Sequence, residues 1–149
     1  MMKKIIMIMF IGVGLLSCDS DDDNNTNPPI DGAVTLALLE ESFVASNGLT
    51  IALFIEDGDD KTSLFSNYVF VFNNNGTVIA SNANQDVSGT FNVFEDDNRF
   101  ELALNFPSNP EFSELNDDWY FVMENDSNIR FDDDDDDDGD GDNIIVFQK

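Results

Sequence analysis

The chain has 149 residues, of which 31 are acidic and 6 are basic, and its formal net charge is −25. This balance excludes nucleic-acid binding, because phosphate contacts need clustered lysine and arginine. The 14 phenylalanines nevertheless supply enough apolar surface for one folded domain.

The first 17 residues have the composition of a bacterial secretory signal. Lys3 and Lys4 precede an apolar run at residues 5–16, and the small residue Ser17 precedes Cys18. A basic start, a short apolar centre and a small residue at the end are typical of a signal peptide. A bilayer-spanning helix needs about 20 apolar residues, so we expect residues 1–17 to be removed rather than to remain as an anchor.

The segment Leu15-Leu16-Ser17-Cys18 resembles a bacterial lipobox. This resemblance implies cleavage before Cys18 and acylation, for example with palmitate, of its sulfur and its amine. Cys18 is the only cysteine, so it has no disulfide partner within the chain. Several acyl chains anchor a protein stably, whereas a single chain does not. We therefore expect a lipid-anchored lipoprotein; the alternative is an ordinary signal whose cysteine is incidental.

The acidic stretch after Cys18 is a candidate for a second localisation signal. Ser20, Asp21, Asp22 and Asp23 resemble the lipoprotein export signal of the Bacteroidota, in which serine or lysine is followed by acidic residues. The resemblance implies attachment to the outer membrane, facing the cell exterior. The alternative is a solvated acidic tether with no address. In either case residues 18–32, rich in Asp, Asn, Thr and Pro, are expected to form a lipidated flexible tether.

Residues 33–149 are expected to form the folded domain, beginning with a short helix. We expect Asp31 to cap a helix that contains Ala33 and residues 36–39, with Glu40 and Glu41 on its polar side. Val34 and Thr35 suit a strand equally well, so a strand remains the alternative for this stretch.

From about residue 49 the pattern changes to short runs rich in Phe, Val, Ile, Tyr and Thr. Turn signals separate them, most clearly Asn74-Asn75-Gly76 and Asp96-Asp97-Asn98. Two longer links contain candidate helical turns at 62–65 and 109–112, the second capped by Asn109 and opened by Pro110. The predicted strands are 49–56, 68–73, 77–83, 86–94, 99–106, 119–125, 128–132 and 143–148.

Alternation along these strands predicts which face meets the core. The predicted strand 99–106 has one wholly apolar side, formed by Phe100, Leu102, Leu104 and Phe106. Glu101, Ala103 and Asn105 lie on its other side. Other strands, such as 68–73 and 143–148, are apolar on both sides. We therefore expect a mainly β domain, an eight-stranded antiparallel meander closing into a barrel with a short N-terminal helix. Two packed sheets are the alternative.

Several segments resemble the lipocalin-like lipoproteins of the Bacteroidota. They are Tyr68-Val69-Phe70-Val71-Phe72, Asn75-Gly76-Thr77, Gly89-Thr90-Phe91, Leu115-Asn116-Asp117-Asp118-Trp119 and Phe147-Gln148-Lys149. The resemblance covers residues 49–149 and implies a lipocalin-like barrel. It departs from the family pattern at Leu49 and Phe91, where such proteins often carry tryptophan.

Four aromatic residues are the candidate ligand site, because the interior of a small barrel can hold one small molecule. They are Phe70, Phe72, Trp119 and Phe121. The alternative is that these side chains simply fill the core.

The most unusual stretch is 132–142, in which seven aspartates precede Gly139-Asp140-Gly141-Asp142. Alternate carboxylates followed by a glycine turn are typical of calcium loops, so Asp134, Asp136, Asp138 and Asp140 are the candidate Ca²⁺ ligands. The twelfth positions hold Ile145 and Phe147, where such a loop needs a bidentate glutamate. The alternative is a low-complexity acidic hairpin loop that keeps the sheet edge from aggregating.

The chain contains no histidine, which removes the usual general base and the Ser-His and Cys-His nucleophile arrangements. We therefore do not expect an enzyme. The sequence predicts a surface lipoprotein that binds a small, partly apolar ligand. The alternative is a non-catalytic interaction module with an acidic, calcium-binding loop.

Overall fold

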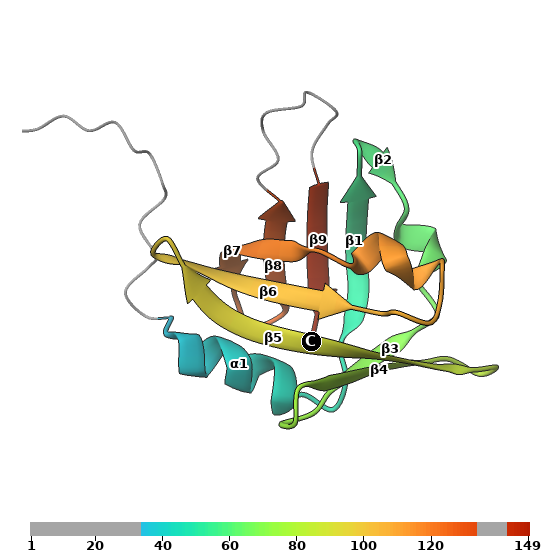
Figure 1. Ribbon diagram of the computed structural model, residues 1–149, viewed down its shortest axis with the longest axis horizontal. Helices are drawn as coiled ribbons and strands as arrows, with labels where there is room; N and C mark the ends of the chain where they lie inside the picture. Colours follow the sequence, from blue (N-terminus) through green and yellow to red (C-terminus); the bar gives the residue numbers. More distant parts are fainter. Residues whose placement is uncertain (1–33, 134–142) are drawn as a thin grey trace, which may run out of the picture.

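The computed structural model describes residues 34–133 and 143–149. The described chain is mainly β, with antiparallel strands, one α-helix and two 3-10 helices (Figure 1). In chain order the elements are α1 (Leu36–Val44), β1 (Thr50–Glu56), β2 (Asp59–Asp60), η1 (Thr62–Leu64), β3 (Val69–Phe72), β4 (Thr77–Ser81), β5 (Asp86–Asp96), β6 (Arg99–Asn105), η2 (Phe112–Leu115), β7 (Asp118–Glu124), β8 (Asn128–Asp133) and β9 (Asn143–Gln148). The predicted fold class is confirmed, with nine strands in the described residues where the sequence predicts eight.

The additional strand is β2, which pairs with the end of β1 through Ile55↔Asp60 and Glu56↔Asp59. Asp57 and Gly58 form the turn between them, and their φ values are 52° and 76°. Two consecutive central residues with positive φ suit a tight two-residue hairpin. A strand of two aspartates has no apolar alternation, so the sequence pattern gives no sign of it.

All nine strands belong to one sheet in the order β2-β1-β9-β8-β7-β6-β5-β4-β3. Figure 1 shows β5 and β6 crossing the direction of β1, β8 and β9 steeply, so the sheet is strongly curled. The curl brings Leu49, just before β1, beside Phe70 in β3. The amide of Leu49 donates to the carbonyl of Phe70 at 2.8 Å, and the reverse bond is 2.7 Å long. This bridge links distant parts of the meander and makes the sheet barrel-like.

The helix starts later than the sequence predicts. Thr35 is the N-cap, and its side-chain oxygen accepts a hydrogen bond from the amide of Leu38 at 3.3 Å. The expected cap Asp31 is therefore wrong as the helix start; it lies outside the described residues. Threonine caps a helix as aspartate does, and the start at Leu36 places Leu39 and Phe43 one turn apart, both fully buried.

The two predicted hairpin turns are confirmed. Gly76 has φ 79°, and Asp97 and Asn98 have φ 45° and 61°. The two longer links contain the 3-10 helices η1 and η2 where helical turns are expected. In the second link, the Asn109 side chain accepts a hydrogen bond from the amide of Glu111 at 3.0 Å, but the helix begins at Phe112 rather than at Pro110.

The core lies on the concave face of the sheet, and the predicted alternation of β6 is confirmed. Phe100, Leu102 and Leu104 are all buried on the inner side. Glu101 is an exception on the other side, because it is only 5% exposed although it belongs to the outer face. Its lateral neighbours are Phe94 on β5 and Tyr120 on β7. An outward carboxylate between two aromatic neighbours is shielded even where the sheet faces solvent.

Candidate functional site

The four predicted ligand-site residues all belong to the packed core. Phe70 and Phe72 lie on β3, and Trp119 and Phe121 lie on β7. The first three are 1–2% exposed, and Phe121 is partly buried against the same core. Burial is expected both for side chains that line a ligand site and for side chains that fill the core. The packing partners of these residues are therefore more informative than their burial.

Phe43 of α1 occupies the middle of the curled sheet. Its ring centroid lies 4.7 Å from that of Phe72, 5.7 Å from Phe147, 5.9 Å from Phe131 and 6.3 Å from Phe91. These separations fall in the range of direct contact between aromatic rings. Side chains of β3, β5, β8 and β9 thus meet around one ring that the helix supplies.

The two predicted ligand-site residues of β7 have different ring neighbours in the core. The indole Nε1 of Trp119 donates a hydrogen bond to the carbonyl of Leu115 at 3.2 Å, and its ring lies 6.0 Å from that of Phe54. Phe121 lies 5.8 Å from Phe131. Trp119 and Phe121 therefore each contact other side chains of the core.

A surface groove of about 420 Å³ lies between α1 and the end of β7. Sequence reasoning did not identify it. Three lining side chains are apolar, two are acidic and one is a serine: Val34, Leu38, Ala45, Glu41, Glu124 and Ser42. Leu38 is 48% exposed, so part of its side chain is open to solvent at the groove. The groove combines an apolar surface with two carboxylates.

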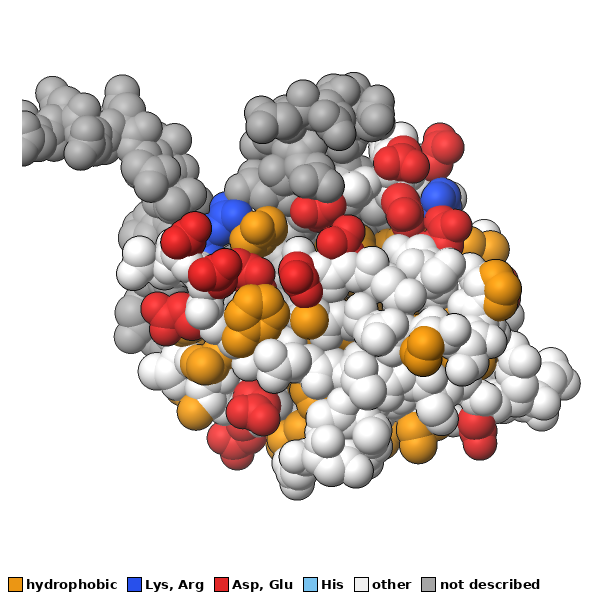
Figure 2. All heavy atoms as spheres, viewed as in Figure 1, with side chains coloured by type: hydrophobic (Ala, Val, Ile, Leu, Met, Phe, Trp, Pro, Cys, Tyr) orange, Lys and Arg blue, Asp and Glu red, His pale blue; other side chains and the backbone are white. Residues whose placement is uncertain are grey.

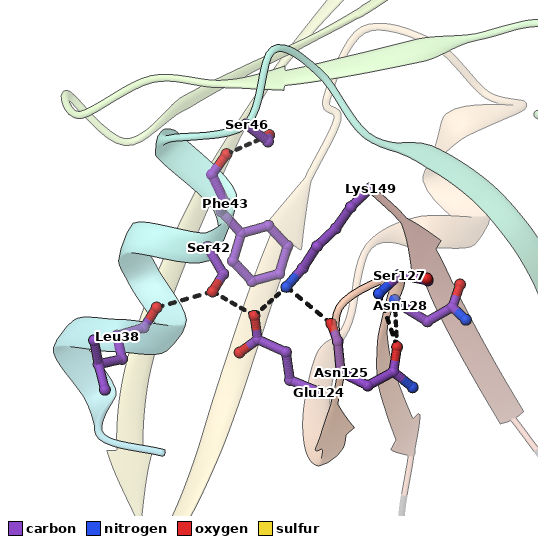
Figure 3. Close-up of polar contacts among 9 residues, drawn as sticks. All are labelled: Leu38, Ser42, Phe43, Ser46, Glu124, Asn125, Ser127, Asn128 and Lys149. Atoms are coloured by element: carbon purple, nitrogen blue, oxygen red, sulfur yellow. Dashed lines mark hydrogen bonds and ion pairs between the residues drawn. The ribbon is translucent and has the colours of Figure 1, made fainter. Parts of the chain in front are cut away.

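The Glu124 carboxylate joins three distant parts of the chain (Figure 3). Its Oε1 accepts hydrogen bonds from the hydroxyl of Ser42 on α1 and from the ammonium of Lys149, both at 2.5 Å. The Lys149 ammonium also donates to the carbonyl of Asn125 at 3.1 Å. Glu124 pairs laterally with the buried Ile129, so it lies on the inner face of β7, at the strand end beside α1.

The helical repeat explains why one short helix serves both the core and the groove. Leu38, Glu41, Ser42 and Ala45 are spaced by three, one and three residues, so they share one side of α1. Leu39 and Phe43 point to the core. The only sequence signal for the groove was an apolar residue, Leu38, displaced from the core-facing pair, and the partner Glu124 is 82 residues away from Ser42.

A second group of charges connects β1 to η2. The Lys61 ammonium lies 2.5 Å from Glu114 Oε2 and 3.9 Å from Glu56 Oε2. Burial raises the pKa of Glu56 to about 7; Lys61 opposes this increase, while Glu114 and Asp57 add to it. The Glu56 Oε2 atom is buried without a hydrogen-bond partner. This carboxyl group therefore changes its charge near neutral pH.

Glu101 forms part of another charged group on the outer face. Burial raises its pKa, nearby Asp96 and Asp118 add to the increase, and Arg99 opposes it. The Arg99 guanidinium stacks over the Tyr120 ring at 3.6 Å from its centroid. A cation over an aromatic face is favourable, so this arrangement supports the outer surface of β6 and β7.

The surface charge is strongly acidic. On the face shown in Figure 2, acidic side chains far outnumber basic ones. The four basic residues of the described chain all have partners: Lys61 contacts Glu114, Arg130 contacts Asp132, Lys149 contacts Glu124 and Arg99 stacks on Tyr120. Each basic side chain of the described residues therefore interacts with another group of the same domain.

The remaining predicted sites lie outside the described residues. They are the lipidation site Cys18, the export signal Ser20, Asp21, Asp22 and Asp23, and the calcium candidates Asp134, Asp136, Asp138 and Asp140. The strands next to the calcium candidates, β8 and β9, pair up to Asp133↔Asn143. Within the described ranges, no group of three or more acidic side chains is placed to hold a metal ion.

In the part of the chain that the structure describes, no helix is long and apolar enough to cross a membrane. Comparisons of the chain with protein-family models, with curated proteins and with solved structures found no match.

Proposed function

We propose that this protein is a lipid-anchored lipoprotein of the outer cell surface and that its β domain is a non-catalytic interaction module. Cys18 and the acidic residues after it support the anchor and the address. The packing of Phe43 against Phe72, Phe131 and Phe147 favours a module over a ligand carrier. Because these rings contact one another around Phe43, we assign recognition to the outer surface.

Binding of a small, partly apolar ligand among Phe70, Phe72, Trp119 and Phe121 remains a prediction. Such a ligand needs space that Phe43 and its neighbours occupy, and packed interiors resist displacement of their side chains. Native mass spectrometry of the full chain, after incubation with extract of its own cells, tests this point. We expect the bare protein mass. A bound mass of a few hundred daltons, lost in Trp119→Phe, would instead favour the ligand carrier.

The lipid anchor is tested by metabolic labelling with a palmitate analogue. The wild-type chain should carry the label and Cys18→Ala should not, because the thiol is the acceptor. Ser20→Ala is the matched control, since it leaves the lipobox intact and should stay labelled. Label on the Cys18→Ala variant would contradict the anchor.

Surface display is tested by adding protease to intact cells. The wild-type protein should be degraded together with a known surface marker. A variant with Asp21, Asp22 and Asp23 replaced by asparagine should keep its lipid but become protected, because the export signal is then neutral. Protection of the wild-type protein would contradict display at the cell exterior.

A further inference from the structure

The groove between α1 and β7 has two kinds of wall. Leu38, nearly half exposed, provides the apolar wall together with Val34 and Ala45. Glu41 and Glu124 provide the acidic wall. A volume of about 420 Å³ is within the range of small binding sites, about 300–1,000 Å³. The groove therefore has room for an occupant that is apolar along its length and positively charged at its end.

Lys149 of the same chain shows that the acidic side of the groove binds an ammonium group. Its ammonium lies 2.5 Å from Glu124 Oε1 and 3.1 Å from the carbonyl of Asn125 (Figure 3). The Lys149 backbone amide also donates to the carbonyl of Ser127 at 2.9 Å, so this lysine is fixed at one end of the groove. Glu41 is exposed on the α1 side and offers a second carboxylate.

Charge rules against an occupant from the protein itself. The tether at 18–32 contains acidic residues and no lysine or arginine, so it offers no positive charge to pair with Glu41. A second copy of the chain brings the same acidic surface, and its described basic side chains already have partners. An anionic lipid surface likewise offers no positive charge. A basic polypeptide is the occupant that complements the groove.

We propose that this groove docks a lysine-bearing segment of a protein partner. The alkyl stem of the partner's lysine lies along Leu38, and its ammonium meets Glu41, as the stem and head of lysine are commonly divided between apolar and polar surroundings. The inference rests on the proposed interaction module and names the chemistry of its partner.

The test uses the full chain and a blocked pentapeptide of alternating leucine and lysine. Binding is followed by nuclear magnetic resonance at physiological ionic strength. The expected result is saturable shifts at the amides of Leu38, Ser42 and Glu124. The same peptide with acetylated lysines, which are neutral, should bind at least about three-fold more weakly, because the surface ion pair with Glu41 is lost.

Matched variants of α1 sharpen the test. Glu41→Gln should weaken binding about three-fold, whereas Glu40→Gln should not, since Glu40 is an exposed neighbour that does not line the groove. Leu38→Ser should weaken binding through the apolar wall. Thermal unfolding of each variant verifies that the fold is retained, as expected for exposed positions.

Absence of binding, equal binding of the acetylated peptide, or equal loss in Glu40→Gln and Glu41→Gln would each overturn the proposal. Equally strong binding of spermidine at the same amides would also overturn it, because the occupant would then be a free polyamine. These results do not depend on where the protein is located. Failure of the labelling or protease experiment would remove the proposed function while leaving the groove measurement valid.

Discussion

The two sides of α1 differ in what they contribute to the protein. On the inner side, Leu39 and Phe43 are fully buried, and Phe43 contacts rings from four strands. On the groove side, Leu38 is 48% exposed and lies in one groove with Glu41. The inner residues explain why the fold is stable. Leu38 and Glu41 have no comparable role in packing, which makes the groove side the better candidate for recognition.

The hydrogen bonds of Glu124 with Ser42 and Lys149, here called the Glu124 junction, should contribute less to stability than the inner side of α1 and more than the groove side. The junction stabilises the position of the helix through Ser42 and fixes Lys149 near the groove. Substitutions that remove inner, junction and groove contacts should therefore form a graded series in stability. The following predictions test that gradation.

Phe43→Ala should have the largest effect. Removing a ring that several others contact leaves a cavity, and such substitutions destabilise by about 3–5 kcal/mol. Denaturant unfolding measures the change in free energy. Leu38→Ala is the matched control on the groove side and should change stability by no more than about 0.5 kcal/mol. Similar losses in both variants would contradict the distinction between the two sides.

Gly89→Ala tests the same interior by overpacking. A Cβ at this position would lie 2.6 Å from Phe106 Cδ1 and 2.7 Å from the Asn105 carbonyl oxygen. Because a backbone atom cannot easily move, we expect a loss of about 1–3 kcal/mol in denaturant unfolding. A neutral result would mean that β5 and β6 are less tightly packed than the structure indicates.

Glu56→Gln should change how stability depends on pH. The folded-state pKa of Glu56 is raised from 4.5 to about 7, so the folded protein binds this proton more tightly than the unfolded chain. The contribution of Glu56 is therefore complete below about pH 4.5 and is lost as pH rises through 7. The shift sets an upper limit of about 3 kcal/mol, and partial exposure of the side chain lowers it.

Measuring unfolding free energy from pH 5 to 8 tests this expectation. The wild-type protein should lose stability relative to Glu56→Gln as pH rises. Asp60→Asn serves as a control without pH dependence in this range, because hydrogen bonds from Thr62 lower the pKa of Asp60 below its usual 3.8 and the carboxylate stays charged throughout. A pH profile that is identical in wild type and Glu56→Gln would contradict the raised pKa.

The smallest of these effects should come from the Glu124 junction. Lys149→Met keeps the apolar stem and removes the ammonium, and we expect a loss of about 1 kcal/mol because the carboxylate is only 13% exposed. Ser42→Ala should cost a similar or smaller amount. The double variant should show coupling, since both side chains bind the same oxygen. Strict additivity would mean that the two contacts are independent.

Features that depend on local pattern follow from the amino-acid sequence alone. The alternation at Phe100, Leu102 and Leu104 was sufficient to assign the inner face of β6, and the turns at Gly76 and Asn98 followed from residues that tolerate positive φ. These features depend on neighbours within a few positions. For this reason the mainly β class could be predicted, and the positions of β1 and of β3 to β9 could be predicted closely.

Features that join distant segments depend on the folded arrangement of the whole sheet and helix. Asp31 and Thr35 are both good helix caps, and burial of Leu39 and Phe43 accompanies the start after Thr35. The Leu49–Phe70 bridge depends on the curl of the whole sheet. Likewise, the groove exists because the fold brings Glu124 to α1 across 82 residues. Local pattern cannot encode such contacts, since each partner is an ordinary residue in its own segment.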